Sequence, residues 1–338
     1  MTDFKQYLLD EFVEDYQQGV LSRRDALKLI AGITGSLALA TSLLAACTPP
    51  DQPAPPTAAA TAANTAPNAT STSSPVPTAA PSATAAPTAT TEPTPTPAAV
   101  SGDSAAGDIV ASDIEFDGAD GAKLLAHLAR PADGAPVPVV LVCHENRGLT
   151  EHIKDVTRRF AREGYVALAV DLLSRQGGTA GKDSSSVPGL LSSQPQDQFV
   201  ADFTSGWRYL QSQSYVQADR VGMTGFCFGG GVTWRVAIGL PELRAAVPFY
   251  GPAPSADEVG QIKAAVLAMY AERDQRITST AAVMETALQR NGHTFEKIIY
   301  PNTDHAFFND TGTRYNAEAA ADAWAKMLAW FDRYLKAA

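Results

Sequence analysis

The sequence predicts an α/β fold in which a mostly parallel central sheet is covered by helices on both faces. Three observations support this fold. Short apolar runs recur after residue 137, polar residues do not alternate within these runs, and amphipathic helical patterns separate one run from the next. Continuous apolar strands that alternate with helices are typical of parallel sheets buried on both faces. The stretch from Ile109 to the C-terminus is long enough for one well-buried domain.

The expected elements follow one another along this domain. An antiparallel hairpin comes first, from two alternating stretches around a turn, at 111–117 and 123–131. Six further strands are expected at 137–144, 165–170, 220–226, 245–250, 265–271 and 295–300. Helices are expected at 152–163, 196–213, 228–239, 278–291 and 314–336. In such a sheet, functional residues lie in loops at the carboxyl ends of the strands.

Residues 1–47 are predicted to be an export signal rather than part of the fold. Arg23-Arg24 precede an apolar run, as in a bacterial twin-arginine signal, and small residues lead to Cys47, as in a lipoprotein. Acyl chains on Cys47 would anchor the mature protein to the outer face of the cell membrane. An uncleaved membrane anchor is the alternative, because the run at 29–46 is just long enough to span. A helix expected at 4–17 would leave with the signal.

Residues 48–108 are almost entirely Ala, Pro, Thr and Ser. So few apolar side chains cannot offset the entropy cost of ordering, and the segment is predicted to be a disordered linker. Residues 109–338 then form the single globular domain. The net charge of −10 gives no basic surface for a nucleic acid partner. Nothing in the helical patterns demands a protein partner, so a monomer is expected.

The stretch Gly-Phe-Cys-Phe-Gly-Gly-Gly at 225–231 lies between an expected strand and an expected helix. A Gly-x-nucleophile-x-Gly stretch in that place is the nucleophile elbow of α/β-hydrolases. Cys227 occupies the position that usually carries serine. A thiol with an ordinary pKa of about 8.5 is only slightly ionised at neutral pH, so it needs a helix N-terminus and a base to activate it.

A base and an orienting carboxylate follow Cys227 in the chain order that these enzymes use, which is nucleophile, acid, histidine. Asp274 follows the expected strand 265–271, and His305 follows the expected strand 295–300. Only His305, among five histidines, combines position, order and a loop. Asp171 is the rival carboxylate, with a structural role as its simpler explanation. No metal or other cofactor is expected, because only a weak His144/His152 pair has ligand spacing.

Five ordered blocks resemble the dienelactone hydrolases. They read HENRGL (144–149), DLLSRQG (171–177), GFCFGG (225–230), ERDQRI (272–277) and DHAFFN (304–309). The resemblance covers essentially all of the domain after the linker. It implies an α/β-hydrolase fold and hydrolysis of an ester or lactone by a Cys-His-Asp triad through a thioester.

The resemblance also implies roles for residues around the triad. Glu145 is similar to a glutamate that pairs with the resting cysteine and would keep it protonated and protected from oxidation. An ion pair with Arg147 is the alternative role for Glu145. The backbone N–H groups of Phe228 and Asn146 are expected to form the oxyanion hole.

Substrate recognition is where the chain departs from the family. Arg175 matches one of two arginines that bind the substrate carboxylate, but Asn309 stands where the second is expected. Hydrolysis of dienelactone itself therefore does not follow, whereas hydrolysis of a small ester or lactone does. A general carboxylesterase or thioesterase, and a non-catalytic binding lipoprotein of the same fold, are the alternatives.

Overall fold

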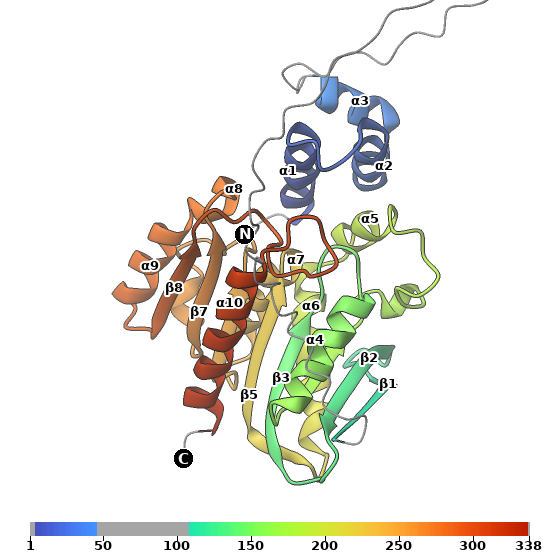
Figure 1. Cartoon of the computed structure of the whole chain (residues 1–338). Coiled ribbons are helices and arrows are strands. Elements are labelled where there is room, and N and C mark those ends of the chain that lie inside the picture. Colours follow the sequence, from blue (N-terminus) through green and yellow to red (C-terminus); the bar gives the residue numbers. More distant parts are fainter. Residues whose placement is uncertain (1–3, 46–107, 337–338) are drawn as a thin grey trace, which may run out of the picture. The chain divides into compact units, whose positions relative to one another are not determined.

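A single sheet forms the centre of the domain (Figure 1), and the computed structural model describes residues 4–45 and 108–336. Within these residues the sheet has eight strands in the order β1-β2-β4-β3-β5-β6-β7-β8. The strands are β1 (Ile109–Asp117), β2 (Lys123–Pro131), β3 (Val137–Cys143), β4 (Val166–Val170), β5 (Val216–Phe226), β6 (Ala245–Phe249), β7 (Ala265–Ala271) and β8 (Phe295–Tyr300).

The sheet is antiparallel only at one edge. β2 pairs antiparallel with both β1 and β4, and β4, β3, β5, β6, β7 and β8 are parallel neighbours. β4, β6 and β7 are buried along their whole length. This matches the prediction from uninterrupted apolar runs, because strands covered on both faces have no polar side to present. The predicted fold class is confirmed.

Helices cover both faces of the sheet (Figure 1). α4 and α10 lie on one face, and α6 and α7 lie on the other. The helices of this domain are α4 (Glu151–Arg162), α5 (Val187–Ser192), α6 (Gln196–Gln211), α7 (Phe228–Gly239), α8 (Gln275–Thr278), α9 (Ala281–Arg290) and α10 (Ala317–Phe331), with short turns η1 (Ser174–Gln176), η2 (Val259–Gln261) and η3 (Asp332–Lys336).

Local chemistry explains where these elements differ from the predicted ones. α5 was not predicted, because six residues with Pro188 near the start show no helical period. α10 starts later than predicted because the side chain of Asn316 accepts a hydrogen bond from the backbone of Ala319 and caps the helix. β5 starts earlier than predicted, at Val216, which pairs with Val137 of β3.

Three helices precede the predicted linker. α1 (Phe4–Gln17) has the predicted bounds, and the apolar run that follows is divided into α2 (Arg23–Thr34) and α3 (Leu37–Ala45). The division falls at Gly35, whose left-handed conformation ends α2. Among the described residues, none of the helices has both the length and the apolar character needed to cross a membrane. These helices and the domain built on the sheet belong to one compact unit.

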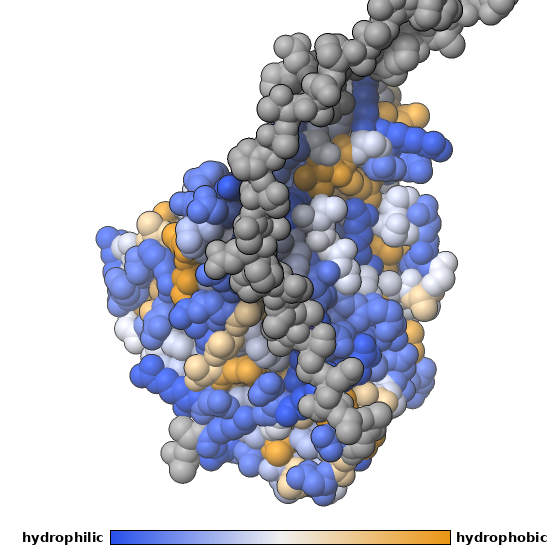
Figure 2. Space-filling view, in the orientation of Figure 1, coloured by the Kyte–Doolittle hydropathy of each residue, from blue (hydrophilic) through white to orange (hydrophobic). Residues whose placement is uncertain are grey.

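On the face that Figure 2 shows, the coloured residues are mostly hydrophilic, and apolar residues lie in small groups. Leu37 and Leu39 of α3 are among the exposed large apolar side chains of the described residues. Cys47 and all but the last residue of the predicted linker at 48–108 lie outside the described residues.

Candidate active site

Cys227 lies at a sharp turn between β5 and α7. Its backbone has φ 58° and ψ −122°, a conformation that L-residues rarely adopt. A Cβ atom on Gly225 would lie 2.3 Å from the carbonyl oxygen of Gly229, so only glycine lets the strand and helix approach this closely. Strained backbone of this kind is typical of functional sites, and here it holds the thiol at the start of α7.

The sheet brings the predicted acid and base to this thiol. Asp274 follows β7 and His305 lies in the loop after β8, both at the carboxyl edge of the sheet. The Nδ1 atom of His305 lies 2.6 Å from Oδ2 of Asp274. A ring nitrogen of His305 lies within 4.8 Å of the Cys227 Sγ atom, and the two side chains influence each other's pKa. The thiol, the imidazole and the carboxylate therefore lie close together at this edge of the sheet, and their role as a catalytic triad stays a prediction.

The electrostatics of the three groups are set by burial and by one another. Burial lowers the pKa of His305, but the charges of Asp274 and Cys227 outweigh it and hold that pKa well above its ordinary value. Burial, followed by the charge of Glu11, raises the pKa of the Cys227 thiol. Burial raises the pKa of Asp274, but His305 outweighs it and the net shift is downward. The resting site therefore favours a neutral thiol.

Glu145 is buried, and its carboxylate is hydrogen-bonded to an amide rather than to the thiol. Its Oε2 atom accepts a hydrogen bond of 2.6 Å from Nδ2 of Asn309, the residue that replaces the second family arginine. The alternative partner, Arg147, donates instead to the backbone oxygen of Ser184. The Glu145 charge is a minor contribution to the raised pKa of Cys227. Its role as partner of the resting thiol stays a prediction.

The two predicted oxyanion-hole residues lie on different elements. Phe228 is the first residue of α7, where backbone N–H groups have no acceptor within the helix. Asn146 follows β3, and its side-chain Nδ2 donates to Oε1 of Glu11 at 2.7 Å. Their joint role stays a prediction.

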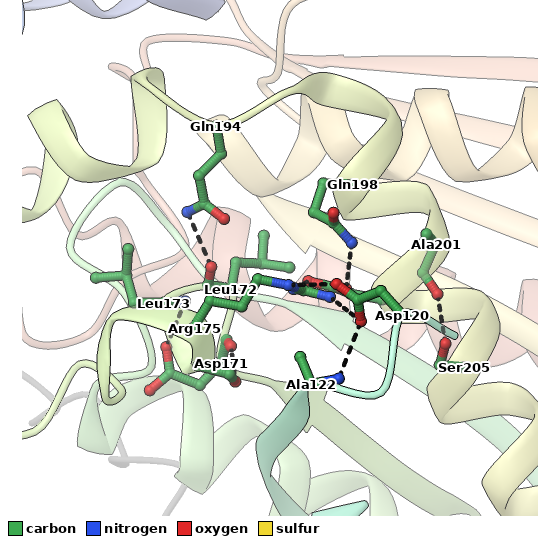
Figure 3. A network of polar contacts seen from close by, with 12 residues as sticks. Asp120, Ala122, Asp171, Leu172, Leu173, Arg175, Gln194, Gln198, Ala201 and Ser205 are labelled. Carbon is green, nitrogen blue, oxygen red and sulfur yellow. Dashed lines mark hydrogen bonds and ion pairs between the residues drawn. The ribbon is translucent and has the colours of Figure 1, made fainter. Parts of the chain in front are cut away.

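Arg175 is held by two carboxylates (Figure 3). Its Nε and Nη2 atoms donate to Asp120 at 3.0 and 2.9 Å, and its Nη1 donates to Asp202 at 2.8 Å. Gln198 donates to the same Asp202 carboxylate. A substrate carboxylate would have to compete with both acids, so the predicted binding role of Arg175 stays untested.

The remaining candidates have structural partners. Asp171 accepts hydrogen bonds from the backbone of Leu173 and from both the backbone and the hydroxyl of Thr179, so it organises the loop after β4. His144 lies between the backbone oxygen of Glu145 and the backbone N–H of Leu172. These contacts agree with the structural role expected for Asp171.

Two residues that contact the thiol come from α1. The Tyr7 hydroxyl lies 3.5 Å from Cys227 Sγ, and the two carboxylate oxygens of Glu11 lie 3.5 and 3.6 Å from it. No motif could have revealed these contacts, because more than 200 residues separate the partners. Glu11, Cys227 and His305 also offer the carboxylate, thiolate and imidazole donors that zinc uses, all within 4.8 Å, and are the described residues that could hold a metal.

Comparison with known proteins agrees with this geometry. A model of the dienelactone hydrolase family matches residues 124–335. The chain is 35% identical over 242 residues to a "Putative carboxymethylenebutenolidase" of Methylorubrum extorquens, covering 68% of this chain and 83% of that protein. A protein of the same name in Escherichia coli K12 is 36% identical over 233 residues, covering 63% and 84%.

A solved structure agrees as well. The crystal structure named "Putative Dienelactone Hydrolase" from Klebsiella pneumoniae superimposes with a TM-score of 0.62 at 35% identity, covering 67% of this chain and 99% of that one. The family match spans the elbow and the loops that carry Asp274 and His305. The chain is therefore a hydrolase of ester or lactone bonds, and it belongs to the dienelactone hydrolase family.

Proposed function

We propose that the protein hydrolyses a small ester or lactone through a thioester on Cys227. One observation carries this proposal. His305, which is hydrogen-bonded to Asp274 at 2.6 Å, lies next to Cys227, and Cys227 has a strained backbone at the turn between a strand and a helix. A base fixed by a carboxylate next to a nucleophile is the arrangement that covalent hydrolases share.

The proposed reaction has two steps, acylation of the thiol and hydrolysis of the thioester. His305 Nε2 takes the thiol proton, and the Cys227 thiolate attacks the substrate carbonyl carbon to form a tetrahedral oxyanion. The oxyanion collapses to a thioester as His305 gives its proton to the leaving alkoxide. Water, deprotonated by His305, then attacks the thioester, which releases the acid and returns the proton to the thiol. Asp274 stabilises the imidazolium formed in both steps.

Two N–H groups support the oxyanion in this scheme. Phe228 contributes the first free N–H of α7, and the backbone of Asn146 contributes the second from the loop after β3. Donors fixed before the reaction stabilise the developing charge without reorganisation, and each is worth roughly 3–4 kcal/mol.

The substrate class is an ester or lactone rather than a named compound. The relatives' name, carboxymethylenebutenolidase, supports a lactone as substrate. Asn309 stands where the family's second arginine is expected, and this difference argues against assigning the relatives' substrate to this protein. Loss of one bidentate arginine changes recognition of a carboxylate in particular.

The test compares variants of the hydrolase domain, residues 109–338, which spans the region that matches the family. Cys227→Ala, Cys227→Ser and the buried control Cys143→Ala are assayed on cis- and trans-dienelactone and on p-nitrophenyl esters of increasing chain length. Turnover that is lost in Cys227→Ala and kept in Cys143→Ala supports the mechanism. Turnover that persists in Cys227→Ala refutes it, and binding without turnover in the unaltered domain favours a binding lipoprotein.

We also propose that the protein is exported and anchored as a lipoprotein. Arg23-Arg24, the apolar run and the small residues before Cys47 support this proposal. The mass of the mature protein tests it: cleavage before Cys47 with acyl groups on its N-terminus is the expected result, and Cys47→Ala should abolish both. Intact, unacylated protein would contradict it. Light scattering of the mature form tests the expected monomer.

A further inference from the structure

One face of α1 is buried although it carries acidic residues. The buried side chains recur at helical spacing, and they are Phe4, Tyr7, Leu8, Glu11, Phe12 and Asp15. Carboxylates are rarely buried unless they have partners, because removing them from water is costly. The partners of this face therefore show what α1 is built to contact.

The acidic side chains of α1 meet arginines and an amide of the hydrolase domain. Asp15 accepts from Arg314 Nη2 at 2.7 Å, and Glu14 accepts from Arg276 Nε at 3.2 Å. Arg276 follows Asp274 at the start of α8 and also lies over the ring of Tyr7, with 4.6 Å between the guanidinium carbon and the ring centroid. Ion pairs thus join α1 to α8 and to the loop between β8 and α10.

The centre of the same face meets the reacting atom itself. Tyr7 and Glu11 both lie within hydrogen-bonding distance of Cys227 Sγ, and Asn146 fixes the Glu11 carboxylate from the other side. As a result, the relative exposure of Cys227 is 3%. An ester carbonyl must come into van der Waals contact with Sγ before attack, and Glu11 and Tyr7 occupy that space.

Apolar contacts extend along both ends of this interface. The ring of Phe4 lies 4.9 Å from that of Phe228, between ring centroids, and packs so closely on α7 that a Cβ on Gly231 would lie 2.5 Å from it. Further along, α2 lies against α5: a Cβ on Gly189 would be 2.5 Å from the backbone oxygen of Gly32. The helices before the linker are thus docked by shape as well as by charge.

We propose that α1 is an autoinhibitory plug that keeps the hydrolase inactive until the segment before Cys47 is removed. This inference rests on the proposed role of Cys227 as nucleophile. Glu11 blocks the approach to Sγ, and its negative charge adds to burial in disfavouring the thiolate. The plug lies on the N-terminal side of the predicted cleavage position. A single cut there would separate α1 from the hydrolase domain, which would remove both the steric and the electrostatic effect of Glu11 and allow turnover.

The test uses the full-length chain and two variants that weaken docking at separate places. Asp15→Lys places a positive charge against Arg314, and Gly189→Val forces α5 away from α2. Asp10→Lys makes the same charge change as Asp15→Lys on the exposed side of α1 and is the matched control. Thermal melting selects the variants that remain folded.

Two measurements distinguish access to the thiol from catalysis. One is the rate of hydrolysis of p-nitrophenyl acetate, and the other is the rate at which iodoacetamide alkylates Cys227. Peptide mass mapping identifies the alkylated cysteine. If the open form is populated to about 0.1–10%, both rates should rise by roughly 10- to 1,000-fold when docking is lost. Asp10→Lys should match the unaltered chain. Buried Cys143 should stay unreactive throughout.

Each outcome decides one question. Faster alkylation in the docking variants with no ester turnover leaves the plug standing and refutes the proposed function. Unaltered chain that turns over ester as fast as a folded docking variant refutes the plug and leaves the proposed function standing. Equal alkylation rates in the unaltered chain, Asp10→Lys and a folded docking variant also overturn the plug.

Discussion

Replacing Glu11 by glutamine removes one negative charge from beside the thiol and keeps the shape of the side chain. The Glu11 oxygens lie 3.5 and 3.6 Å from Cys227 Sγ. Unit charges about 4 Å apart interact by about 4 kcal/mol at an effective dielectric constant of 20. Each 1.36 kcal/mol of that energy changes the ratio of thiolate to thiol tenfold. Because Arg276 and Arg314 offset part of the Glu11 charge, we expect a lower pKa of Cys227 in Glu11→Gln and, at neutral pH, alkylation that is roughly 10- to 1,000-fold faster.

The sign of this change can be measured without any substrate. A like charge disfavours the thiolate, so Glu11→Gln lowers the pKa and raises the thiolate fraction at every pH below the new midpoint. The assay follows alkylation of Cys227 in the full-length chain across neutral and alkaline pH. Asp10→Asn, which removes one charge from the exposed side of α1, is the control. An alkylation midpoint that is the same in Glu11→Gln and Asp10→Asn would refute the electrostatic reasoning.

Three further predictions follow from contacts in the domain. Asp274→Asn should lower the pKa of His305 and reduce turnover of the released domain by roughly 100- to 10,000-fold, measured as kcat, and an unchanged kcat would remove Asp274 from the mechanism. Arg314→Gln should speed alkylation of the full-length chain, whereas exchanging the pair (Asp15→Arg with Arg314→Asp) should slow it again; faster alkylation that the exchange fails to reverse would contradict the pairing. Gly148→Ala should lower Tm and cost about 1–3 kcal/mol or more, because Gly148 has φ +80° and a Cβ would lie 2.2 Å from the Thr179 hydroxyl; an unchanged Tm would contradict this.

The sheet could be predicted because each strand carries its own signal. β6 and β7 are short apolar runs between helical patterns, and their bounds in the structure are those of the pattern to within one residue. The loops after β5, β7 and β8 then follow from the rule that parallel strands end at the same edge. Elements with weak local signals were missed: α5 is too short to show a helical period, and α8 (Gln275–Thr278) is a single turn that ends where the predicted helix at 278–291 begins.

The α1 contacts could not be predicted, for a different reason. The bounds of α1 follow from its own sequence, and helix formation is a local property. Where α1 docks depends on the ion pairs that its two acidic side chains form with Arg276 and Arg314. Only the fold brings these two arginines close together. Sequence spacing carries no information about such a contact, and the Arg23-Arg24 pair at the start of α2 indicates only an export signal.

Glu11 also changes how the resting thiol is understood. A carboxylate next to a cysteine disfavours the thiolate, and since the thiolate is the form that oxidants attack, it protects the cysteine. The family resemblance assigns that task to Glu145, but Glu145 contacts Asn309 and contributes less to the raised pKa of Cys227 than Glu11 does. While α1 is in place, the proposed block of the site therefore comes from the same side chain that adds to burial in raising the pKa of the thiol. Removal of α1 would end both contributions of Glu11 together, because one carboxylate produces them.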